Sequence, residues 1–245
     1  MSQKKTLLKY TKYVMWGTVA LIPPAAFFYL LEFYTHNPFA EVRPWAQLFN
    51  IVLFELLAGI FLCITGRLRT AYRIEGTAAL VFGLANAYVV RFRTNPLVPW
   101  DILSWRTAVS VSGNYDFTPD TRLIVVSFLF LALIIGLQPV KFKIGRPGFF
   151  KRCLPGVVLG AVLVMFAGTL QQENFQNEHR LYNKLFTPVF MTQVDGIPVT
   201  FVMNLAYMSI EKPQKYSVGE AKEFLKKYEK PQETEESIDT ILEEE

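Results

Sequence analysis

Five apolar runs within the first 170 residues constrain the fold of this chain more than any other feature. A helix needs roughly 20 apolar residues, and about 17 at the least, to cross the hydrocarbon core of a bilayer. A core helix of a water-soluble protein would carry a polar stripe along its length, but the fourth run has only Ser127 as a polar residue and the fifth only Thr169. The pattern predicts an all-α, polytopic membrane protein with five transmembrane helices, at about 14–34, 46–66, 71–90, 123–137 and 154–170.

The basic residues predict the orientation of these helices. Segments 1–13, 67–73 and 141–152 carry twelve Lys and Arg residues, whereas segments 35–45 and 91–122 carry five. The positive-inside rule then places the N-terminus in the cytoplasm and, after five crossings, the C-terminus outside the cell. We therefore expect a multi-pass protein of the cell membrane. A basic excess beside membrane spans contacts lipid headgroups, and no basic run interleaved with exposed aromatic residues indicates nucleic-acid binding.

Three regions follow from this layout. Residues 1–170 form the predicted transmembrane domain, and residues 171–230 an extracellular juxtamembrane connector that contains helices. Within the connector, 197–208 is apolar but only about half a span long, so we expect it to lie on the membrane surface or to be re-entrant. Residues 231–245 have seven acidic side chains and no basic one, which predicts a solvated acidic linker.

The extracellular segment 91–122 is too long for a simple connection. Pro99 suits the first turn of a helix, and the apolar spacing that follows predicts an interfacial amphipathic helix over about 99–112, anchored by Trp100 and Trp105. We expect the next helix to begin with Thr118 as its N-cap and Pro119 as its first residue.

A cluster of polar and aromatic side chains accompanies this interfacial helix. Guanidinium groups bind phosphate with two parallel hydrogen bonds, so the cluster predicts a lipid-headgroup site. The alternative is that the arginines reach toward headgroups without specificity. The candidate residues are Arg91, Arg93, Asn95, Trp100, Asp101 and Arg106.

Two polar residues stand inside the apolar runs, namely Glu55 in the second and Asn86 in the third. An ionisable group at this depth costs a few kcal/mol and marks function by default. The alternative is structural: Glu55 is protonated and hydrogen bonded to another span, for example to Asn86. The pair Pro23-Pro24 predicts a kink or break in the first span, of structural origin or as a hinge.

Signatures of catalysis and of metal binding are absent from the sequence. His36 and His179 form no metal-binding motif, and no Gly-rich phosphate loop or nucleophile motif is present. Cys63 and Cys153 have no paired spacing. We therefore predict no catalytic residue, metal ligand or cofactor in this chain, and whether the chain is itself an enzyme is left open.

Three stretches nevertheless resemble a known family. They are Arg91-Phe-Arg-Thr-Asn-Pro-Leu-Val-Pro-Trp-Asp-Ile-Leu-Ser, then Gly113-Asn-Tyr-Asp-Phe-Thr-Pro, and Asp195-Gly-Ile-Pro-Val-Thr-Phe-Val-Met-Asn-Leu with the following Glu211-Lys-Pro and Tyr216-Ser. They are similar to the membrane domain and connector of lipoteichoic acid synthase-like proteins. These belong to the sulfatase/phosphoglycerol transferase group of Gram-positive bacteria.

The resemblance implies a function in cell-envelope synthesis. Family members have five spans and an extracellular α/β catalytic domain with a threonine nucleophile and a divalent metal, commonly manganese. They transfer glycerol phosphate from phosphatidylglycerol to a glycolipid-anchored polymer. No threonine of this sequence matches the nucleophile motif, and the chain ends where that domain is expected to begin. We therefore expect a membrane-anchoring, lipid-binding domain whose partners are phosphatidylglycerol and its own C-terminal catalytic domain.

Two other functions remain open. One is a stand-alone lipid-binding or transport protein in which Glu55 and Pro23-Pro24 form the working site. Transporters tend to have internal repeats and paired broken helices, and we find no repeat in this sequence. The other is a structural anchor without lipid specificity. The transferred group, the acceptor and the oligomeric state do not follow from the sequence.

Overall fold

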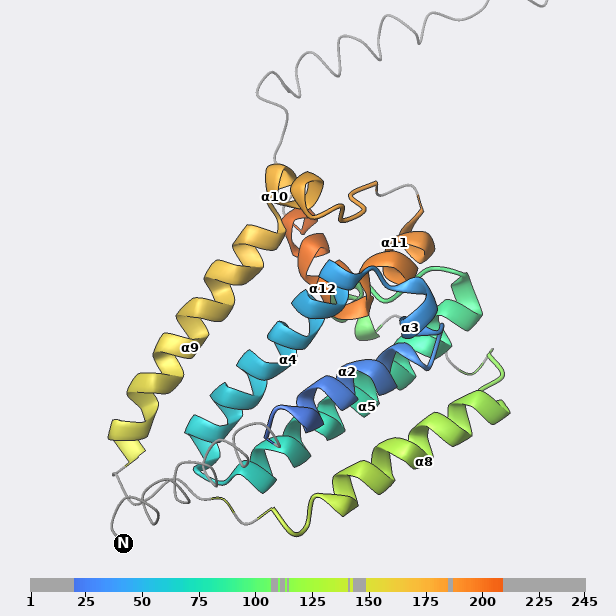
Figure 1. The fold of residues 1–245 in the computed structure, drawn as a ribbon. Helices are drawn as coiled ribbons and strands as arrows, with labels where there is room; N and C mark the ends of the chain where they lie inside the picture. Colours follow the sequence, from blue (N-terminus) through green and yellow to red (C-terminus); the bar gives the residue numbers. More distant parts are fainter. Residues whose placement is uncertain are drawn as a thin grey trace, which may run out of the picture. The chain divides into compact units, whose positions relative to one another are not determined.

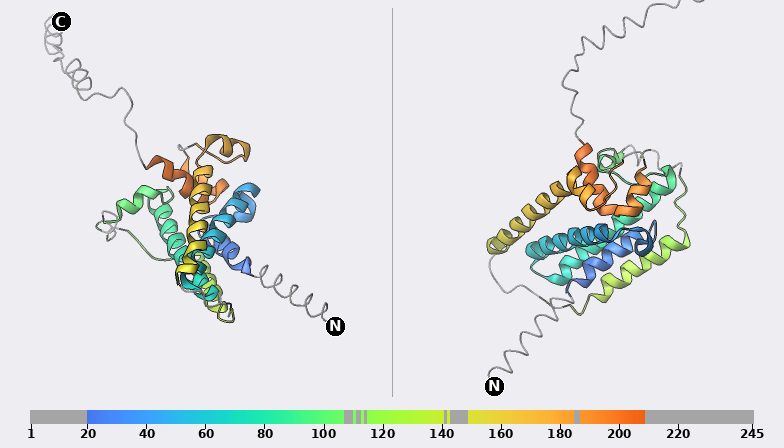
Figure 2. Two further views of the ribbon diagram at one scale, coloured as in Figure 1. Left: turned by 90° about the vertical axis from the view of Figure 1, so that its left-hand side faces the viewer. Right: turned by 45° about the horizontal axis from the view of Figure 1, so that its top comes forward.

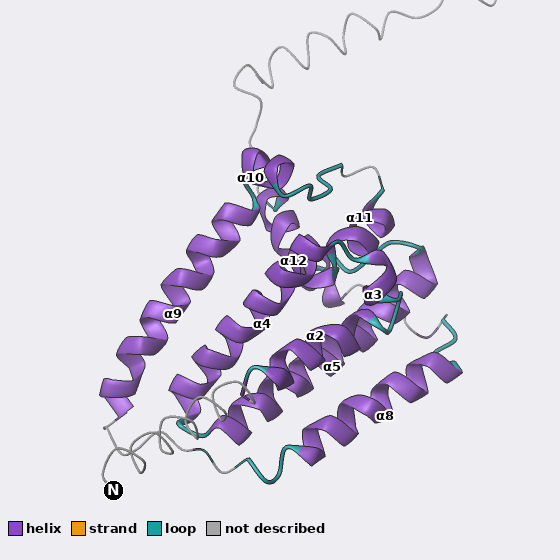
Figure 3. Ribbon diagram, in the orientation of Figure 1, coloured by secondary structure: helices purple, strands orange, loops and turns teal. Residues whose placement is uncertain are grey.

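A computed structural model describes most of the predicted transmembrane and connector regions. It covers residues 20–106, 110, 113, 115–140, 142, 149–184 and 187–208. Every regular element among these residues is a helix and none is a strand, which confirms the all-α prediction (Figure 1, Figure 3). The acidic linker 231–245 and the end of the connector lie outside the described residues, as do residues 1–19, which include residues 14–19 of the first predicted span.

The five apolar runs correspond to five helices. They are α2 (Ile22–Glu32), α4 (Pro44–Thr65), α5 (Leu68–Arg93), α8 (Thr121–Gly136) and α9 (Phe149–Leu170). Helices α4 and α9 are long and apolar enough to cross a membrane. Helices α2 and α8 are apolar but shorter, and α5 carries charged residues near both ends. Length and composition therefore support two candidate spans among the described residues, fewer than the five predicted.

Local sequence signals explain where these helices begin and end. The pair Pro23-Pro24 lies in the first turn of α2, directly after a turn at Leu21, where a missing N–H costs nothing. Helix α4 ends at Gly66, whose φ of 65° is the left-handed conformation that favours glycine. Helix α8 is capped by the side chain of Asp120, which accepts a hydrogen bond from Leu123 N. The predicted start at Thr118 and Pro119 was wrong by two residues, because the Asp120 carboxylate is the group that reaches the free N–H groups.

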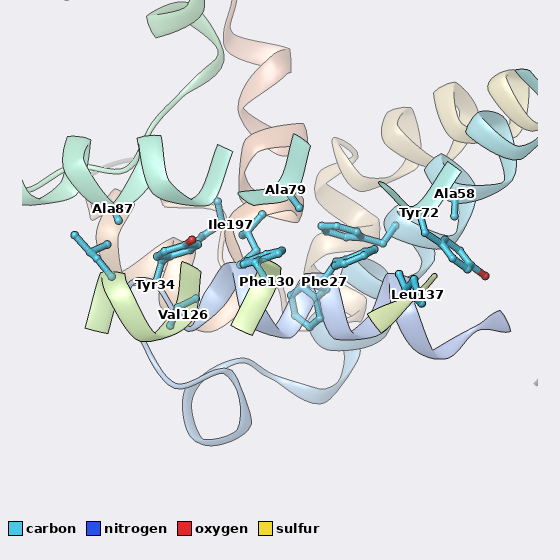
Figure 4. Close-up of a cluster of buried hydrophobic side chains, with 14 residues drawn as sticks. Phe27, Tyr34, Ala58, Tyr72, Ala79, Ala87, Val126, Phe130, Leu137 and Ile197 are labelled. Atoms are coloured by element: carbon cyan, nitrogen blue, oxygen red, sulfur yellow. The ribbon is translucent and has the colours of Figure 1, made fainter. Parts of the chain in front are cut away.

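Helices α2, α4, α5 and α8 enclose one apolar core. Helix α2 packs against α4, α5 and α8, and α5 packs against α4 and α8 (Figure 1). Phe27 of α2 and Tyr34, two residues after the end of α2, stack on Phe130 of α8, as Figure 4 shows. Gly76 and Gly83 of α5 face these rings so closely that a Cβ atom would lie 2.6 Å from Phe27 Cζ and 2.7 Å from Tyr34 Cδ2. Small residues thus let α5 approach its neighbours, as at helix interfaces in membranes.

The connector folds back onto the helices. It contains α10 (Glu173–Glu178), α11 (Pro188–Asp195), α12 (Ile197–Asn204) and a 3₁₀ turn, η2 (Leu205–Tyr207). Helix α12 packs against α4 and α9 (Figure 1, Figure 2). Ile197, Val199 and Met203 are fully buried. The first part of the half-length apolar segment is therefore buried among the other helices, whereas Leu205, Tyr207 and Met208 at its end are exposed.

At each of the two ends of the helices, a hydrogen bond joins neighbouring loops. Leu68 N donates to Phe142 O (3.2 Å), which joins the turn between α4 and α5 to the segment after α8. Arg122 Nε donates to Phe33 O (2.7 Å), which joins the start of α8 to the end of α2. The predicted cytoplasmic loops 67–73 and 141–152 thus meet at one end of the helices, through the part of each that the structure describes.

A turn interrupts the described part of the predicted interfacial helix. Helix α6 (Pro99–Leu103) begins at Pro99 as expected, Ser104 follows in a turn, and Trp105, Arg106 and Ser110 are again helical. Residues 107–109, 111 and 112 of the predicted helix lie outside the described residues. A further short helix, α3 (Pro38–Glu41), connects α2 to α4.

The close contact of α5 with α2 gives a direct test of the packing. We expect Gly76→Leu to lower the thermal unfolding midpoint by roughly 2–10 °C, because overpacking costs about 1–3 kcal/mol or more. The matched control is Gly160→Leu on α9, where an added Cβ meets nothing within 4 Å. Equal midpoints for the two variants in circular dichroism would contradict the packing described here.

Candidate functional site

The residues of the predicted headgroup cluster lie in a folded loop, which hydrogen bonds from its own arginines stabilise. Arg93 Nη1 donates to Asp101 Oδ1 (2.8 Å), and its Nη2 pairs with Asp101 Oδ2 and donates to Pro96 O (3.1 Å). Asp101 Oδ2 also accepts from Val98 N (2.8 Å) at the start of α6. The guanidinium of Arg93 is therefore engaged within the loop, where its fork fits a carboxylate.

Asn86 anchors the same loop from α5. Its Oδ1 accepts a hydrogen bond from Leu97 N (2.8 Å), and its side chain is buried. Between Asn86 and Leu97 the backbone turns at Thr94, which has the left-handed φ of 57°. No hydrogen bond between Glu55 and Asn86 is present in the described part of the chain. The suggested bond between the two spans was wrong, because the Asn86 amide oxygen is used by the loop.

Arg91 holds the segment that leads to α8. Its Nη1 donates to Thr118 O (2.7 Å), and the neighbouring Tyr88 hydroxyl donates to Phe117 O (2.8 Å). Hydrogen bonds from the Thr118 side chain and backbone N–H hold the pKa of Asp116 below its usual value, and Arg91 lowers it further. One Nη of Arg91 is thus engaged, and the other donors of this exposed guanidinium have no partner among the described residues.

The remaining predicted residues are exposed around α6. Arg106 lies over the ring of Trp105, 5.7 Å from its centroid. Trp100, Trp105 and Asn95 are exposed, and so are the apolar side chains of Ile102 and Leu103. The loop therefore presents aromatic and aliphatic surface together with the guanidinium groups of Arg91 and Arg106.

A second polar cluster, which the sequence did not predict, surrounds Gly196 between α11 and α12. Asn50 of α4 donates through Nδ2 to Ala46 O and to Asp195 O, both at 2.7 Å, and accepts from Val199 N (2.9 Å). Glu32 of α2 accepts from Ile197 N (2.7 Å) through Oε1. Its Oε2 lies 3.1 Å from Nε2 of His36. We name Glu32, His36, Asn50 and Asp195 the Gly196 cluster; all four are buried.

Every donor in the first turn of α12 finds a partner in this cluster or in α11. Helix N-termini leave about four N–H groups without an intrahelical acceptor. Here Gly196 N bonds to Thr192 O (2.9 Å), Ile197 N to Glu32, and Val199 N to Asn50. Pro198 has no N–H, and Thr200 N makes the first bond of the helix, to Gly196 O (3.1 Å). Side chains of α2 and α4 thus cap α12, and a carboxylate also suits the positive end of its dipole.

Glycine is required at the centre of the cluster. Gly196 has a φ of 81° and a ψ of 155°, a conformation that is almost exclusive to glycine. A Cβ atom there would lie 2.4 Å from Asn50 Nδ2 and 3.1 Å from Glu32 Oε1. The sequence signal for this turn was the stretch Asp195-Gly-Ile-Pro, but nothing in it identified Glu32 and Asn50 as its partners.

Asp195 closes the cluster on the connector side. Its Oδ2 accepts from Tyr182 N (2.6 Å), whereas its Oδ1 is buried without a partner among the described residues. Burial raises the pKa of Asp195 to about 7, against smaller opposing contributions from the Tyr182 N–H and from Arg43. Arg43 N in turn donates to Val194 O (2.9 Å), so the start of α4 and the end of α11 are joined.

Glu55 lies apart from both clusters. It is half-buried on α4, and its carboxyl interacts electrostatically with Glu75 and Tyr72 of α5. No group of three or more His, Cys, Asp or Glu side chains able to hold a metal ion occurs in the described ranges.

Comparisons with protein-family models, curated proteins and solved structures found no match to this chain. The resemblance to lipoteichoic acid synthase-like proteins therefore stays a prediction.

The raised pKa of Asp195 predicts how stability changes with pH. An unfolded aspartate has a pKa of about 3.9, so between about pH 4 and 7 the folded chain holds a proton that the unfolded chain has lost. Stability then falls as the pH rises through this window, by at most roughly 1.4 kcal/mol per pH unit, and levels off above it. Asp195→Asn should flatten this slope in thermal unfolding midpoints measured from pH 5 to 8. A stability that rises over this range, or an unchanged slope in the variant, would contradict the prediction.

Proposed function

We propose that this chain is embedded in the cell membrane as a five-span domain. The observation that carries the proposal is the exposure of α9: only 6% of its 18-residue apolar window is buried, and Val164 and Met165 are more than 70% exposed. Helix α8 likewise exposes Phe128 and Ile135. Water-soluble proteins bury a helix that is apolar all round, and large exposed apolar patches mark membrane or protein contacts.

The orientation follows from charge and from the arrangement of the loops. Loops 67–73 and 141–152 are rich in Lys and Arg. Phe142, a described residue of the second loop, accepts a hydrogen bond from Leu68 in the first, and Arg69 bonds to Gln138 just before the second loop. One basic end is what the positive-inside rule requires for a cytoplasmic face. We place the N-terminus in the cytoplasm and the connector outside the cell.

Within the membrane, we propose that the chain binds a lipid substrate for a lipoteichoic acid synthase-like phosphoglycerol transferase. Catalysis belongs to an extracellular sulfatase-type domain, in which the family would hold manganese. The donor would be phosphatidylglycerol, and the acceptor a glycolipid or polymer of the envelope. The support is the resemblance of the loop 91–104 and of the connector to that family, together with the chemistry of the exposed loop.

The contacts of the loop divide its arginines between two roles. Arg93 is paired with Asp101 and shapes the loop. Arg91 and Arg106 are exposed beside apolar and aromatic surface, so they are the groups that we assign to the lipid phosphate. Trp100 and Trp105 suit the membrane interface, where aromatic rings anchor proteins.

This assignment predicts a loss of anionic-lipid binding. Replacing Arg91 and Arg106 together by Gln should weaken binding of phosphatidylglycerol to the 245-residue chain by about tenfold or more, because a charge-assisted hydrogen bond contributes roughly 1.5–3 kcal/mol. Native mass spectrometry of the detergent-solubilised protein measures this binding. The matched control changes Arg67 and Arg73 at the opposite end to Gln, with the same loss of charge. Equal weakening in both double variants would refute the site.

The same double substitution of Arg91 and Arg106 tests the transferase role when the chain is joined to its catalytic domain. Lipid-dependent turnover should fall, whereas hydrolysis of a soluble phosphodiester should be unchanged, because only the lipid uses the loop. Loss of both activities to the same extent, or of neither, would contradict the proposed role.

A stand-alone lipid-binding or transport protein is the second candidate function. It is favoured by one observation: the carboxyls of Glu55 on α4 and Glu75 on α5 interact electrostatically. Retention of full lipid-dependent turnover in the variant that lacks Arg91 and Arg106, with loss in Glu55→Gln, would favour this second function.

A further inference from the structure

A cleft of about 540 Å³ opens between α4, α5, α9 and α12. Its volume is in the range of small-molecule sites, about 300–1,000 Å³. Leu53 and Leu57 line it from α4, Leu163 and Ala167 from α9, and Phe201 from α12. Glu75 of α5 is the one ionisable side chain in the wall of this cleft. Neither the arginine loop nor the Gly196 cluster contributes to it.

Glu75 has no partner for either of its oxygen atoms. The side chain is 2% exposed, and both Oε1 and Oε2 are buried without a hydrogen bond in the described part of the chain. The ionisable groups that interact electrostatically with it are Glu55 on α4 and Tyr72 on its own helix. The Tyr72 hydroxyl is already used, since it donates to Ala20 O. Buried polar groups in native proteins are almost always paired, so an unpaired carboxyl in the wall of a cleft points to a ligand.

The surroundings of Glu75 select the chemistry of that ligand. Among the described residues no Lys or Arg lines the cleft, and a carboxylate without a counter-ion in an apolar site is far more costly than the neutral acid. A neutral carboxyl donates one hydrogen bond and accepts others, which matches a hydroxyl group. An anionic phosphate would lose its hydration in this apolar cleft without gaining a cationic partner among the described residues.

The depth of Glu75 within the helices also favours an uncharged ligand group. Glu75 is the eighth residue of α5, which places it roughly 10 Å along the helix from its start. At that depth a charged headgroup would be expensive, whereas a single hydroxyl is tolerated when it is hydrogen bonded. The walls of the cleft include α4 and α9, the two helices long enough to span a bilayer, so the surrounding medium supplies hydrocarbon chains.

We propose that this cleft binds the hydrocarbon chain of a neutral lipid with a free hydroxyl, and that the Glu75 carboxyl hydrogen bonds that hydroxyl. The inference rests on the proposed membrane location, but it does not depend on the transferase activity or on the arginine loop. It gives the molecule a second lipid site, selective for an uncharged lipid.

Photolabelling tests this selectivity on the full 245-residue chain in phosphatidylcholine nanodiscs. The first probe is a diacylglycerol with a diazirine in one acyl chain, and the second is the same lipid with its hydroxyl acetylated. We expect the hydroxyl probe to label the 163–167 region of α9 at least fivefold more than the acetylated probe. Glu75→Leu should bring the two probes to the same level, whereas Glu75→Gln, which can still donate and accept, should keep a preference for the hydroxyl probe.

Two substitutions of the same size separate the cleft from the outer surface of α9. Ala167→Phe fills the cleft and should abolish the preferential labelling, whereas Ala161→Phe, on an exposed position that does not line the cleft, should leave it unchanged. Thermal unfolding of each variant checks that the chain is folded.

The outcomes distinguish this inference from the proposed function. Equal labelling by the hydroxyl and acetylated probes overturns the second lipid site and leaves the membrane domain intact. A phosphatidylglycerol probe that labels this region as strongly as the hydroxyl probe also overturns it. A chain that partitions into the aqueous fraction and is labelled by no lipid overturns both.

Discussion

The capping of α12 by side chains of other helices is the interaction on which the arrangement of the connector depends. Ile197 N and Val199 N would be buried donors without partners if Glu32 and Asn50 were absent, and each such group costs about 1–3 kcal/mol. The same bonds tie residues more than 140 positions apart, since Asn50 lies on α4. Directional bonds of this kind determine where α12 lies along α2 and α4. Apolar contacts alone would not fix its position along these helices.

This constraint also shapes the apolar cleft. Because α12 is held against α4 and α9, its Phe201 forms a wall of that cleft.

Much of the fold could be predicted from the sequence, whereas the polar contacts could not. Apolar runs and proline positions predicted the helices, because these signals are local. The second apolar run, 46–66, ends at the residue that follows α4, and Pro99 begins α6. The capping roles of Glu32 and Asn50 could not be predicted, because a single acid or amide in an apolar run does not specify its hydrogen-bond partner. Arg93 and Asp101 were predicted as lipid ligands, but the fold pairs them with each other. Spacing in sequence cannot tell a bond within a loop from a contact with a ligand.

Hydrogen exchange at the start of α12 tests the central claim most directly. In the unsubstituted chain, the amides of Ile197 and Val199 should be protected to nearly the same degree as those in the middle of α4. In Asn50→Ala the protection of residues 197–204 should fall by at least tenfold, while the protection of α8, which makes no hydrogen bond with the Gly196 cluster among the described residues, should be unchanged. Rapid exchange of Ile197 and Val199 in the unsubstituted chain, or full protection in the variant, would contradict the account.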